Sequence, residues 1–450
     1  MATTNPYLEG NYAPVSEEVT ATDLRVRGTI PDALCGRYLR NGPNPVHPPD
    51  PATYHWFTGD GMVHGIRLRA GRAEWYRNRW VRAEHVAGAL GEERRPGPPP
   101  HGDMDAGPNT NVIGHAGRTF ALVEAGARPF ELTDTLDSVG PTDLGGTLGG
   151  GYTAHPKRDP ESGELYAVSY FWGWGNDVEV TVIDRDARVR SARRVALGGS
   201  SMLHDCAITE RFVVVLDLPI VFSMEAVQQG ALFPYRWQEG YRSRVGLLPR
   251  DGDSTDAVWH DVEPCYVFHF MNAYDDGEGV VLDVVRYDSV FRTSLLGPDE
   301  SEPTLERWHL DGHGGQVKEE RLDDRGQEFP RVDERRVGRP HRFGYAVSSA
   351  ASPVAAQEGA LIRHDFAAGT STVRRLGRDA KPGEAVFVPR SADAAEDDGW
   401  LLALVYTAED DRSALHIVDT ADLTGDPQAV VELPQRVPVG FHGNWVPDLA

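Results

Sequence analysis

The stretch EPCYVFHFMNAYD, residues 263–275, places one histidine in an apolar, β-rich run that leads into an Asn-Ala-Tyr-Asp turn. A half-buried strand normally alternates apolar and polar residues, with the polar ones toward water. Here Phe268 and Phe270 flank His269, and apolar or aromatic residues extend back to Tyr266. A buried imidazole needs a partner for each ring nitrogen, which the backbone or a metal ion supplies. The stretch therefore predicts a buried strand whose histidine is either a core residue or a ligand.

Short β-rich runs alternate with turns rich in Gly, Pro, Asp and Asn on both sides of this stretch. With 48 glycines and 32 prolines in 450 residues, long helices have little room. Many short strands are typical of a sandwich, a barrel or a propeller, and no per-blade repeat decides between them. At this length a propeller is the most economical single domain, so we expect an all-β fold. Strands are expected at residues 119–123, 165–170, 178–184, 212–217, 280–286, 400–406 and 415–418.

The amino-acid composition indicates in which cellular compartment the protein resides and which classes of binding partner it has. The chain is 40% hydrophobic and 25% charged, and its net charge of -23 disfavours a nucleic-acid partner. The three cysteines, Cys35, Cys206 and Cys265, form no CxxC pair, which favours a reducing cytosol over a disulfide framework. The first 15 residues lack the pattern of a signal peptide, and the apolar run at 212–222 is too short to cross a bilayer. We therefore expect a cytoplasmic protein without a nucleic-acid partner.

The segment 223–238 differs from the β-rich runs because its apolar residues recur at helical spacing. It either caps the fold, lines a substrate mouth or touches a membrane surface. Its apolar residues are Met224, Val227, Leu232, Phe233 and Trp237.

Three further histidines share the apolar or tightly turned setting of His269. They are His155, His204 and His442, and all four are too dispersed for a local metal motif such as HExxH. They converge only if each comes from a different strand or blade. Four neutral imidazoles suit Fe, Cu, Ni or Zn, and carboxylates are then expected to orient the rings. The candidate carboxylates, each alternatively a solvated turn or edge acid, are Glu124, Glu328 and Glu384.

Ten short motifs in this chain resemble those of the carotenoid cleavage oxygenases, a family of non-haem iron dioxygenases with bacterial members. The resemblance covers roughly residues 28–445, with the segments in the family's order. The motifs are RNGPNP (40–45), HWFTGDGMVH (55–64), AHP (154–156), HD (204–205), FHFMNAY (268–274), EFPR (328–331), GRPH (338–341), GEAVFVPR (383–390), EDDG (396–399) and FHG (441–443).

The resemblance implies a seven-bladed β-propeller with a dome of loops and helices over one face. It implies an N-terminal arm at 1–24 and one propeller domain at 25–450, with cap insertions that include about 219–245. Fe(2+) on the axis would be held by His155, His204, His269 and His442, with dioxygen as co-substrate and no catalytic residue beyond the iron site. In the family pattern Glu124 supports His204, Glu328 supports His269 and Glu384 supports His442, whereas His155 has no carboxylate. Thr110 would lie beside an otherwise open iron position.

The family reaction is oxidative cleavage of a carbon–carbon double bond into two carbonyl products. The substrate implied is a long, apolar, conjugated molecule, and aromatic residues near the ligands suit its tunnel: Phe57, Phe268 and Phe329. Because such substrates reside in membranes, we expect transient contact with a membrane surface.

Relatives that cleave hydroxylated stilbenes tend to carry a lysine just before the residue that matches Glu124. Val123 stands there, and Lys157 is the first lysine in the chain, which favours a carotenoid or apocarotenoid over a stilbenoid. A stilbene-cleaving oxygenase remains the alternative within the family. An isomerohydrolase acting on retinoid esters would share the same metal motifs, and a non-enzymatic binding propeller would hold no iron.

Overall fold

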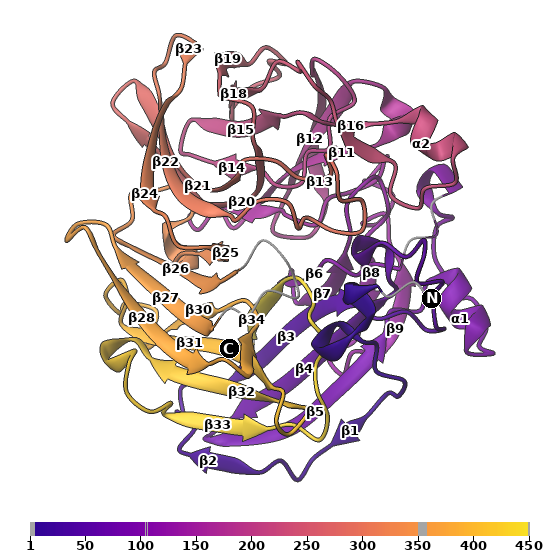
Figure 1. Ribbon diagram of the computed structural model, residues 1–450, viewed down its shortest axis with the longest axis vertical. Helices are drawn as coiled ribbons and strands as arrows, with labels where there is room; N and C mark the ends of the chain where they lie inside the picture. Colours follow the sequence, from indigo (N-terminus) through magenta and orange to yellow (C-terminus); the bar gives the residue numbers. More distant parts are fainter. Residues whose placement is uncertain (1–4, 104, 106, 350–357, 449–450) are drawn as a thin grey trace.

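Strands make up most of the structure, a computed structural model that describes residues 5–448 apart from 104, 106 and 350–357. Seven sheets of four to six strands follow one another around a common axis, which makes the fold a seven-bladed β-propeller (Figure 1). In Figure 1 the blades run from indigo through magenta and orange to yellow, and the yellow strands return beside the indigo ones. The predicted all-β propeller is confirmed.

The first four blades come mainly from consecutive antiparallel strands. The first joins β1 (Thr20–Ala21), β3 (Gly36–Pro43), β4 (Gly61–Arg69), β5 (Arg72–Trp80) and β34 (Gly443–Pro447). The second holds β6 (Asn111–His115), β7 (Arg118–Leu122), β8 (Phe130–Leu132) and β9 (Ser138–Pro141). The third holds β10 (Lys157–Arg158), β11 (Leu165–Tyr170), β12 (Asp177–Ile183) and β13 (Val189–Ala196). The fourth holds β14 (Ala207–Ile208), β15 (Phe212–Asp217), β18 (Arg244–Pro249), β19 (Val258–Asp261) and β23 (Gly315–Gln316).

The remaining three blades complete the ring. The fifth holds β20 (Tyr266–Asp276), β21 (Gly279–Tyr287), β22 (Thr304–Leu310) and β24 (Lys318–Asp323). The sixth holds β25 (Gln327–Arg331), β26 (Phe343–Ser348), β27 (Gly359–Asp365) and β28 (Thr370–Gly377). The seventh holds β2 (Val26–Gly28), β29 (Ala380–Pro382), β30 (Val386–Pro389), β31 (Gly399–Thr407), β32 (Arg412–Asp419) and β33 (Ala429–Glu432).

Two strand exchanges close the ring. The N-terminal strand β2 pairs with β33 of the seventh blade, and the C-terminal strand β34 pairs with β3 of the first. The N-terminal part of the chain thus adds the outermost strand of the seventh blade, and the C-terminal part adds the innermost strand of the first.

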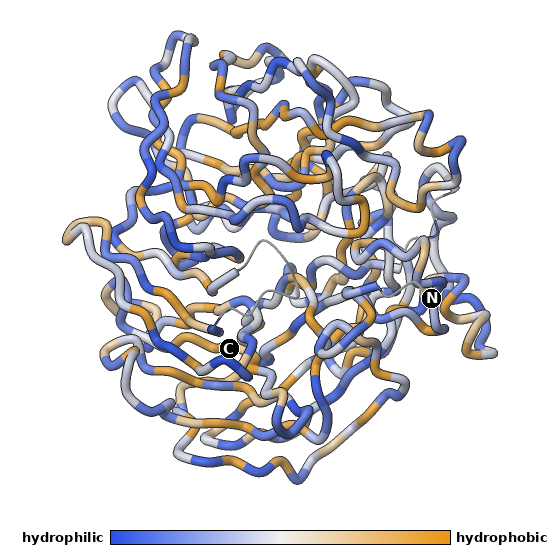
Figure 2. The backbone as a smooth tube through the Cα atoms, in the orientation of Figure 1, coloured by the Kyte–Doolittle hydropathy of each residue, from blue (hydrophilic) through white to orange (hydrophobic). Residues whose placement is uncertain are grey.

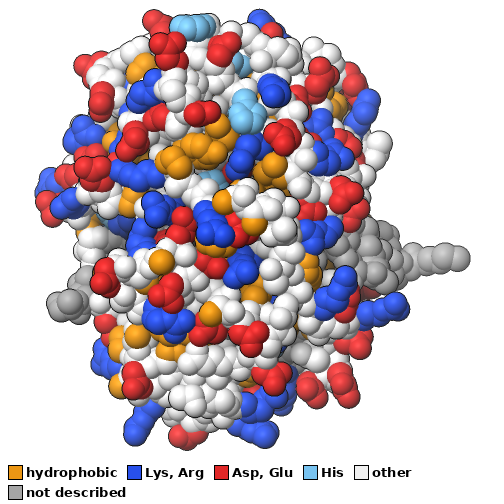
Figure 3. All heavy atoms as spheres, turned by 90° about the vertical axis from the view of Figure 1, so that its left-hand side faces the viewer, with side chains coloured by type: hydrophobic (Ala, Val, Ile, Leu, Met, Phe, Trp, Pro, Cys, Tyr) orange, Lys and Arg blue, Asp and Glu red, His pale blue; other side chains and the backbone are white. Residues whose placement is uncertain are grey.

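The hydrophobic core lies within and between the blades. Figure 2 shows apolar segments along the strands, whereas most connecting turns are hydrophilic. The largest cluster joins the third, fourth and fifth blades through residues such as Val180, Val214, Leu282 and Trp308. β-Branched and aromatic side chains fill these faces, as expected for sheets packed on both sides. On the face that carries β24 and β28, charged side chains of both signs are interspersed (Figure 3).

Helices are short and lie outside the blades. They are α1 (Glu84–Ala89) and α2 (Met224–Gln228), with single turns such as η1 (Pro6–Leu8), η2 (Gly10–Tyr12), η3 (Trp56–Thr58) and η5 (Trp172–Trp174). The helical spacing expected over 223–238 is only partly correct. The helix ends at Gln228, and residues 235–237 form β17 (Tyr235–Trp237), which pairs with β16 (Ile220–Phe222). Nowhere in the described ranges is there a helix with the length and apolarity needed to cross a bilayer.

Candidate metal centre

Each of the seven blades sends one metal-ligating or carboxylate side chain to the propeller axis. Four are histidines: His155 precedes β10, His204 precedes β14, His269 lies in β20 and His442 immediately precedes β34. Three are glutamates: Glu124 follows β7, Glu328 lies in β25 and Glu384 lies between β29 and β30. Inner strands of a propeller converge on its axis, so residues far apart in sequence meet there.

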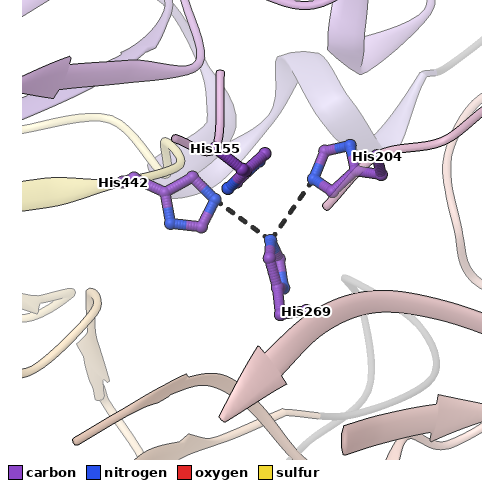
Figure 4. Close-up of side chains that lie close together, drawn as sticks. All are labelled: His155, His204, His269 and His442. Atoms are coloured by element: carbon purple, nitrogen blue, oxygen red, sulfur yellow. Dashed lines mark hydrogen bonds between the residues drawn. The ribbon is translucent and has the colours of Figure 1, made fainter. Parts of the chain in front are cut away.

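The four imidazoles face one another around a single point (Figure 4). One ring nitrogen from each lies within 4.8 Å of those of the others, and all four residues are buried. Nε2 of His269 lies 3.0 Å from Nε2 of His442 and 3.3 Å from Nε2 of His204. Neighbouring nitrogens that bind one ion at roughly 2.1 Å are separated by roughly 3.0–3.4 Å, so this spacing fits a shared cation.

The carboxylates determine which nitrogen faces the axis. Nδ1 of His269 donates to Glu328 at 2.7 Å, and Nδ1 of His442 donates to Glu384 at 3.0 Å. These bonds place the proton on Nδ1 and leave the lone pair of Nε2 toward the axis, the tautomer that binds a metal.

The third histidine–carboxylate pair has looser geometry. Glu124 Oε1 lies 2.6 Å from Nδ1 of His204, but the N–H direction is poorly aligned with the oxygen. The short separation still fixes Nδ1 as the side of the ring that faces the carboxylate.

Without a cation this arrangement is unfavourable, because lone pairs at 3.0–3.3 Å repel. Nε2 of His155 is buried, and no described group hydrogen-bonds to it. Burial lowers the pKa of His155 well below its usual value, and the neighbouring imidazoles lower it further. Burial also lowers the pKa of His442 to about 4, despite the carboxylate of Glu384. Burial therefore favours the neutral form of His155 and of His442. Four converging imidazole nitrogens are the donor set of a divalent transition-metal site, and the residues fit such an ion.

Irregular backbone in two neighbouring blades aims two of these side chains. The pairing of β20 with β21 shifts register between Val267 and Asn272, so His269 lies in a β-bulge. In β25, Phe329 has a φ of +53°, which is rare for a non-glycine residue. Bulges and strained backbone cluster at functional sites because they redirect side chains.

A cavity of about 1290 Å³ reaches the cluster from one side, and its wall includes His204, His269 and His442. All five residues predicted for the substrate and oxygen pocket lie on this wall: Phe57, Thr110, Val123, Phe268 and Phe329. Phe268 meets His204 edge-on at 5.2 Å between ring centroids, and Phe329 stacks on His269 at 5.5 Å. The hydroxyl of Thr110 donates to Asn109 at 2.9 Å, and its backbone carbonyl accepts from the N–H of His442 at 3.0 Å.

A second cavity of about 700 Å³ reaches His155, His269 and His442 from another side and has a charged lining. Arg331 lies on its wall and contacts Glu384 at 3.3 Å. The same guanidinium also donates to Glu334, to Asn444 and to the backbone carbonyl of Gly443. Together these bonds connect the sixth blade to the residues that follow His442.

Sequence reasoning missed four residues around the site. Arg331 is the last residue of the EFPR motif, but the motif alone predicted no function for it. Tyr170 and Tyr287 hydrogen-bond to Glu124 and Glu328, and neither had a signal in the sequence. Lys381 lies on the wall of the large cavity, whereas the lysine typical of stilbene-cleaving relatives was expected directly before Glu124.

A propeller that directs four histidines and three carboxylates to its axis has the donor set of a metalloenzyme. A family model described as Retinal pigment epithelial membrane protein matches residues 12–447. A carotenoid cleavage oxygenase of Mycobacterium tuberculosis is 47% identical over 491 aligned positions, with 98% of both chains covered.

Two solved structures have the same fold. A crystal structure of a lignostilbene dioxygenase from Pseudomonas brassicacearum is 28% identical, with a TM-score of 0.89 over 99% of both chains. Cobalt-substituted apocarotenoid oxygenase of Synechocystis is 26% identical, with a TM-score of 0.85 over 100% of both chains. This chain belongs to the carotenoid cleavage oxygenase family, and the resemblance drawn from its motifs is confirmed.

A glutamate next to a ligand offers a direct test of the site. We expect Glu328→Gln to weaken metal binding roughly 10- to 100-fold, because the amide no longer orients His269 as a carboxylate does. Titration of the metal-free protein with Fe(2+) or Co(2+) measures this change. The matched control is Glu334→Gln. Glu334 pairs with Arg331, but its side chain is 52% accessible. Equal affinities for Glu328→Gln and wild type would contradict the assigned pairing.

Proposed function

We propose that the protein is a non-haem Fe(2+)-dependent dioxygenase that cleaves a carbon–carbon double bond of a carotenoid or apocarotenoid. The observation that carries this proposal is the position of the imidazole cluster on the wall of a large, mainly apolar cavity. Its volume of about 1290 Å³ exceeds the roughly 300–1,000 Å³ of ordinary ligand pockets, which suits a long substrate.

In the proposed reaction one alkene and one dioxygen give two carbonyl compounds. The double bond breaks and each carbon takes one oxygen atom, so no further reductant or proton is consumed. When bound to His155, His204, His269 and His442, Fe(2+) supplies the one-electron chemistry that lets dioxygen react with an alkene.

The chain's own residues orient the substrate and exclude water. Phe57, Phe268 and Phe329 give the cavity aromatic surfaces against which a polyene packs. Because the hydroxyl of Thr110 donates to Asn109, it does not donate to a molecule in the cavity. Val123, beside Glu124 on the same wall, provides an apolar contact where a lysine would select a phenol.

A stilbenoid is the second candidate substrate, and one observation favours it. Lys381 contributes an amine to the cavity wall, where burial lowers its pKa. It lies with Arg378 and Tyr406 on another part of the wall from Val123. The similar lignostilbene dioxygenase gives this alternative further support.

Product analysis distinguishes the two substrates. We expect the Fe(2+)-loaded protein to convert an apocarotenal under labelled dioxygen into two carbonyl products, each with one labelled oxygen in mass spectra. Resveratrol, offered separately, should remain uncleaved because Val123 does not bind its phenol. The control Val123→Lys tests that reason and should gain activity on resveratrol.

Two outcomes would be decisive. Cleavage of resveratrol alone would overturn the substrate proposal and leave the metal site intact. In that case Lys381→Met should abolish the activity if this amine binds the phenol. No labelled carbonyl product from either substrate would contradict the dioxygenase proposal itself.

We also propose that the cavity mouth docks on a membrane surface. Four exposed apolar residues line this cavity: Trp172, Met224, Val227 and Leu232, with 45%, 55%, 42% and 59% of their surfaces accessible. Exposed apolar clusters of this kind mark interaction sites, and this one lies where an apolar substrate would enter.

Vesicle flotation tests the docking proposal. Neutral phosphatidylcholine vesicles are the appropriate probe, because a net charge of -23 opposes binding to anionic lipid. We expect wild type to float and the double variant Met224→Asp, Leu232→Asp to stay in the aqueous fraction. The matched control is Leu90→Asp, Val139→Asp, at exposed apolar positions directly after α1 and in β9. Equal flotation of the Met224/Leu232 variant and wild type would contradict the proposal.

A further inference from the structure

Two tyrosine hydroxyls lie behind two of the three carboxylates. Tyr170 donates to Oε2 of Glu124 at 3.0 Å, and Tyr287 donates to Oε1 of Glu328 at 3.1 Å. In each carboxylate the other oxygen faces a histidine, Oε1 of Glu124 toward His204 and Oε2 of Glu328 toward His269. The same chain of contacts, from tyrosine to glutamate to histidine, therefore occurs twice, once across the second to fourth blades and once across the fifth and sixth.

Both tyrosines are buried and lie on the wall of the large cavity, with 5% and 4% of their surfaces accessible. The third glutamate is held differently. Glu384 receives hydrogen bonds from Arg331 and from the backbone N–H of Gly443, and it lies on the wall of the second cavity. The orientation of His204 and His269 thus depends on the substrate side of the site, whereas that of His442 depends on the other side.

A carboxylate held at only one oxygen rotates about its terminal bond. When a second donor holds the other oxygen, the plane of the carboxylate is fixed, and so is the direction in which it accepts from the imidazole. A tyrosine does this without neutralising the carboxylate, unlike an arginine. Burial raises the pKa of Tyr170 and of Tyr287 well above the usual value, and the adjacent carboxylates raise it further, so both hydroxyls keep their protons.

We propose that Tyr170 and Tyr287 are positioning residues that fix His204 and His269 for metal binding through Glu124 and Glu328. This inference rests on the proposed function, because it assigns the four histidines as ligands. It adds that a substrate in the cavity touches the same rings that hold two of the four ligands. The metal geometry is therefore sensitive to what fills the cavity.

Metal titration of single variants tests the inference without relying on turnover. Metal-free Tyr170→Phe and Tyr287→Phe, each titrated with Co(2+) and followed by its visible absorption, should bind roughly 3- to 10-fold more weakly than wild type. This is less than the roughly 10- to 100-fold expected when the carboxylate itself is lost, because the hydroxyl acts one contact further away. The Co(2+) absorption bands should also shift, since they report ligand geometry.

The matched control is Tyr345→Phe. Tyr345 is also buried, and its hydroxyl donates at 2.7 Å to the carboxylate of Asp397, which pairs with Arg363 rather than with a histidine of the cluster. Urea denaturation of all three variants measures the cost of losing a buried hydroxyl. We expect that cost to be similar among them, with Co(2+) affinity changed only for Tyr170→Phe and Tyr287→Phe.

A double-mutant cycle separates positioning from general structure. If Tyr170 acts through Glu124, then Tyr170→Phe should have no further effect on Co(2+) affinity in a Glu124→Gln background. Additive losses in the cycle, or wild-type affinity in both tyrosine variants, would overturn the inference while leaving the metal site in place. Failure of the wild-type protein to bind Co(2+) or Fe(2+) would instead overturn the proposed function.

Discussion

Replacement of His269 by alanine should abolish metal binding and reduce double-bond cleavage to background, while the propeller stays folded. His269 is the histidine whose Nε2 lies within 3.3 Å of two others, so its removal leaves the cluster without its common neighbour. Glu328 keeps hydrogen bonds from Tyr287 and from the backbone of Phe329, so the carboxylate is not left entirely without donors. Mass spectrometry measures the metal content of the variant, and far-UV circular dichroism shows whether the propeller stays folded.

A second buried histidine provides the control. His364 has 3% of its surface accessible, and its two ring nitrogens contact Gln327 and Ser371 rather than another imidazole. His364→Ala should lower stability by an amount similar to that of His269→Ala and leave metal content unchanged. Full metal occupancy in His269→Ala would show that the assigned site is wrong.

Arg331→Met should lower the free energy of unfolding by about 3–5 kcal/mol, the usual cost of removing one partner from a buried ion pair. The side chain of Arg331 is 14% accessible and that of Glu384 only 1%, so the carboxylate of Glu384 has little contact with water of its own. The variant also loses the bonds from Arg331 to Asn444 and to the carbonyl of Gly443, which connect the sixth blade to the closing strand. Urea denaturation of the metal-free protein measures this change in the free energy of unfolding without any contribution from bound metal.

Arg342→Met is the matched substitution at the surface. Arg342 pairs with Asp365 in a two-pronged contact, but its side chain is 54% accessible. Exposed pairs contribute about 0.2–1 kcal/mol, so this variant should unfold close to wild type. Equal destabilisation by the two substitutions would mean that the Arg331–Glu384 pair has no special role.

The sequence predicted the strands well because their signals are local. The runs at 165–170 and 212–217 coincide with β11 and β15, and those at 119–123 and 280–286 differ from β7 and β21 by one residue at each end. Apolar and β-branched side chains decide such elements within a few positions. The segment 223–238 was misjudged because helical spacing persisted beyond Gln228, where pairing of β17 with β16 overrides it.

The candidate site depended on the whole chain. The motifs indicated His155, His204, His269 and His442, but nothing local indicated that seven residues from seven blades would meet on one axis. The bulge at His269 and the positive φ of Phe329 arise from tertiary packing and left no pattern to find. Tyr170 resembled any core tyrosine, since its hydrogen bond to Glu124 joins different blades.

The closure of the ring has a consequence for the timing of biosynthesis. His442 immediately precedes β34, which is synthesised after the other described strands and completes the first blade beside β3. A nascent chain therefore carries at most three of the four imidazoles until residue 442 is translated, and the fourth reaches the axis only when the ring closes. Assembly of the four-histidine cluster therefore waits for ring closure, and a nonsense mutation just upstream of His442 would yield a protein that lacks both a candidate metal ligand and β34.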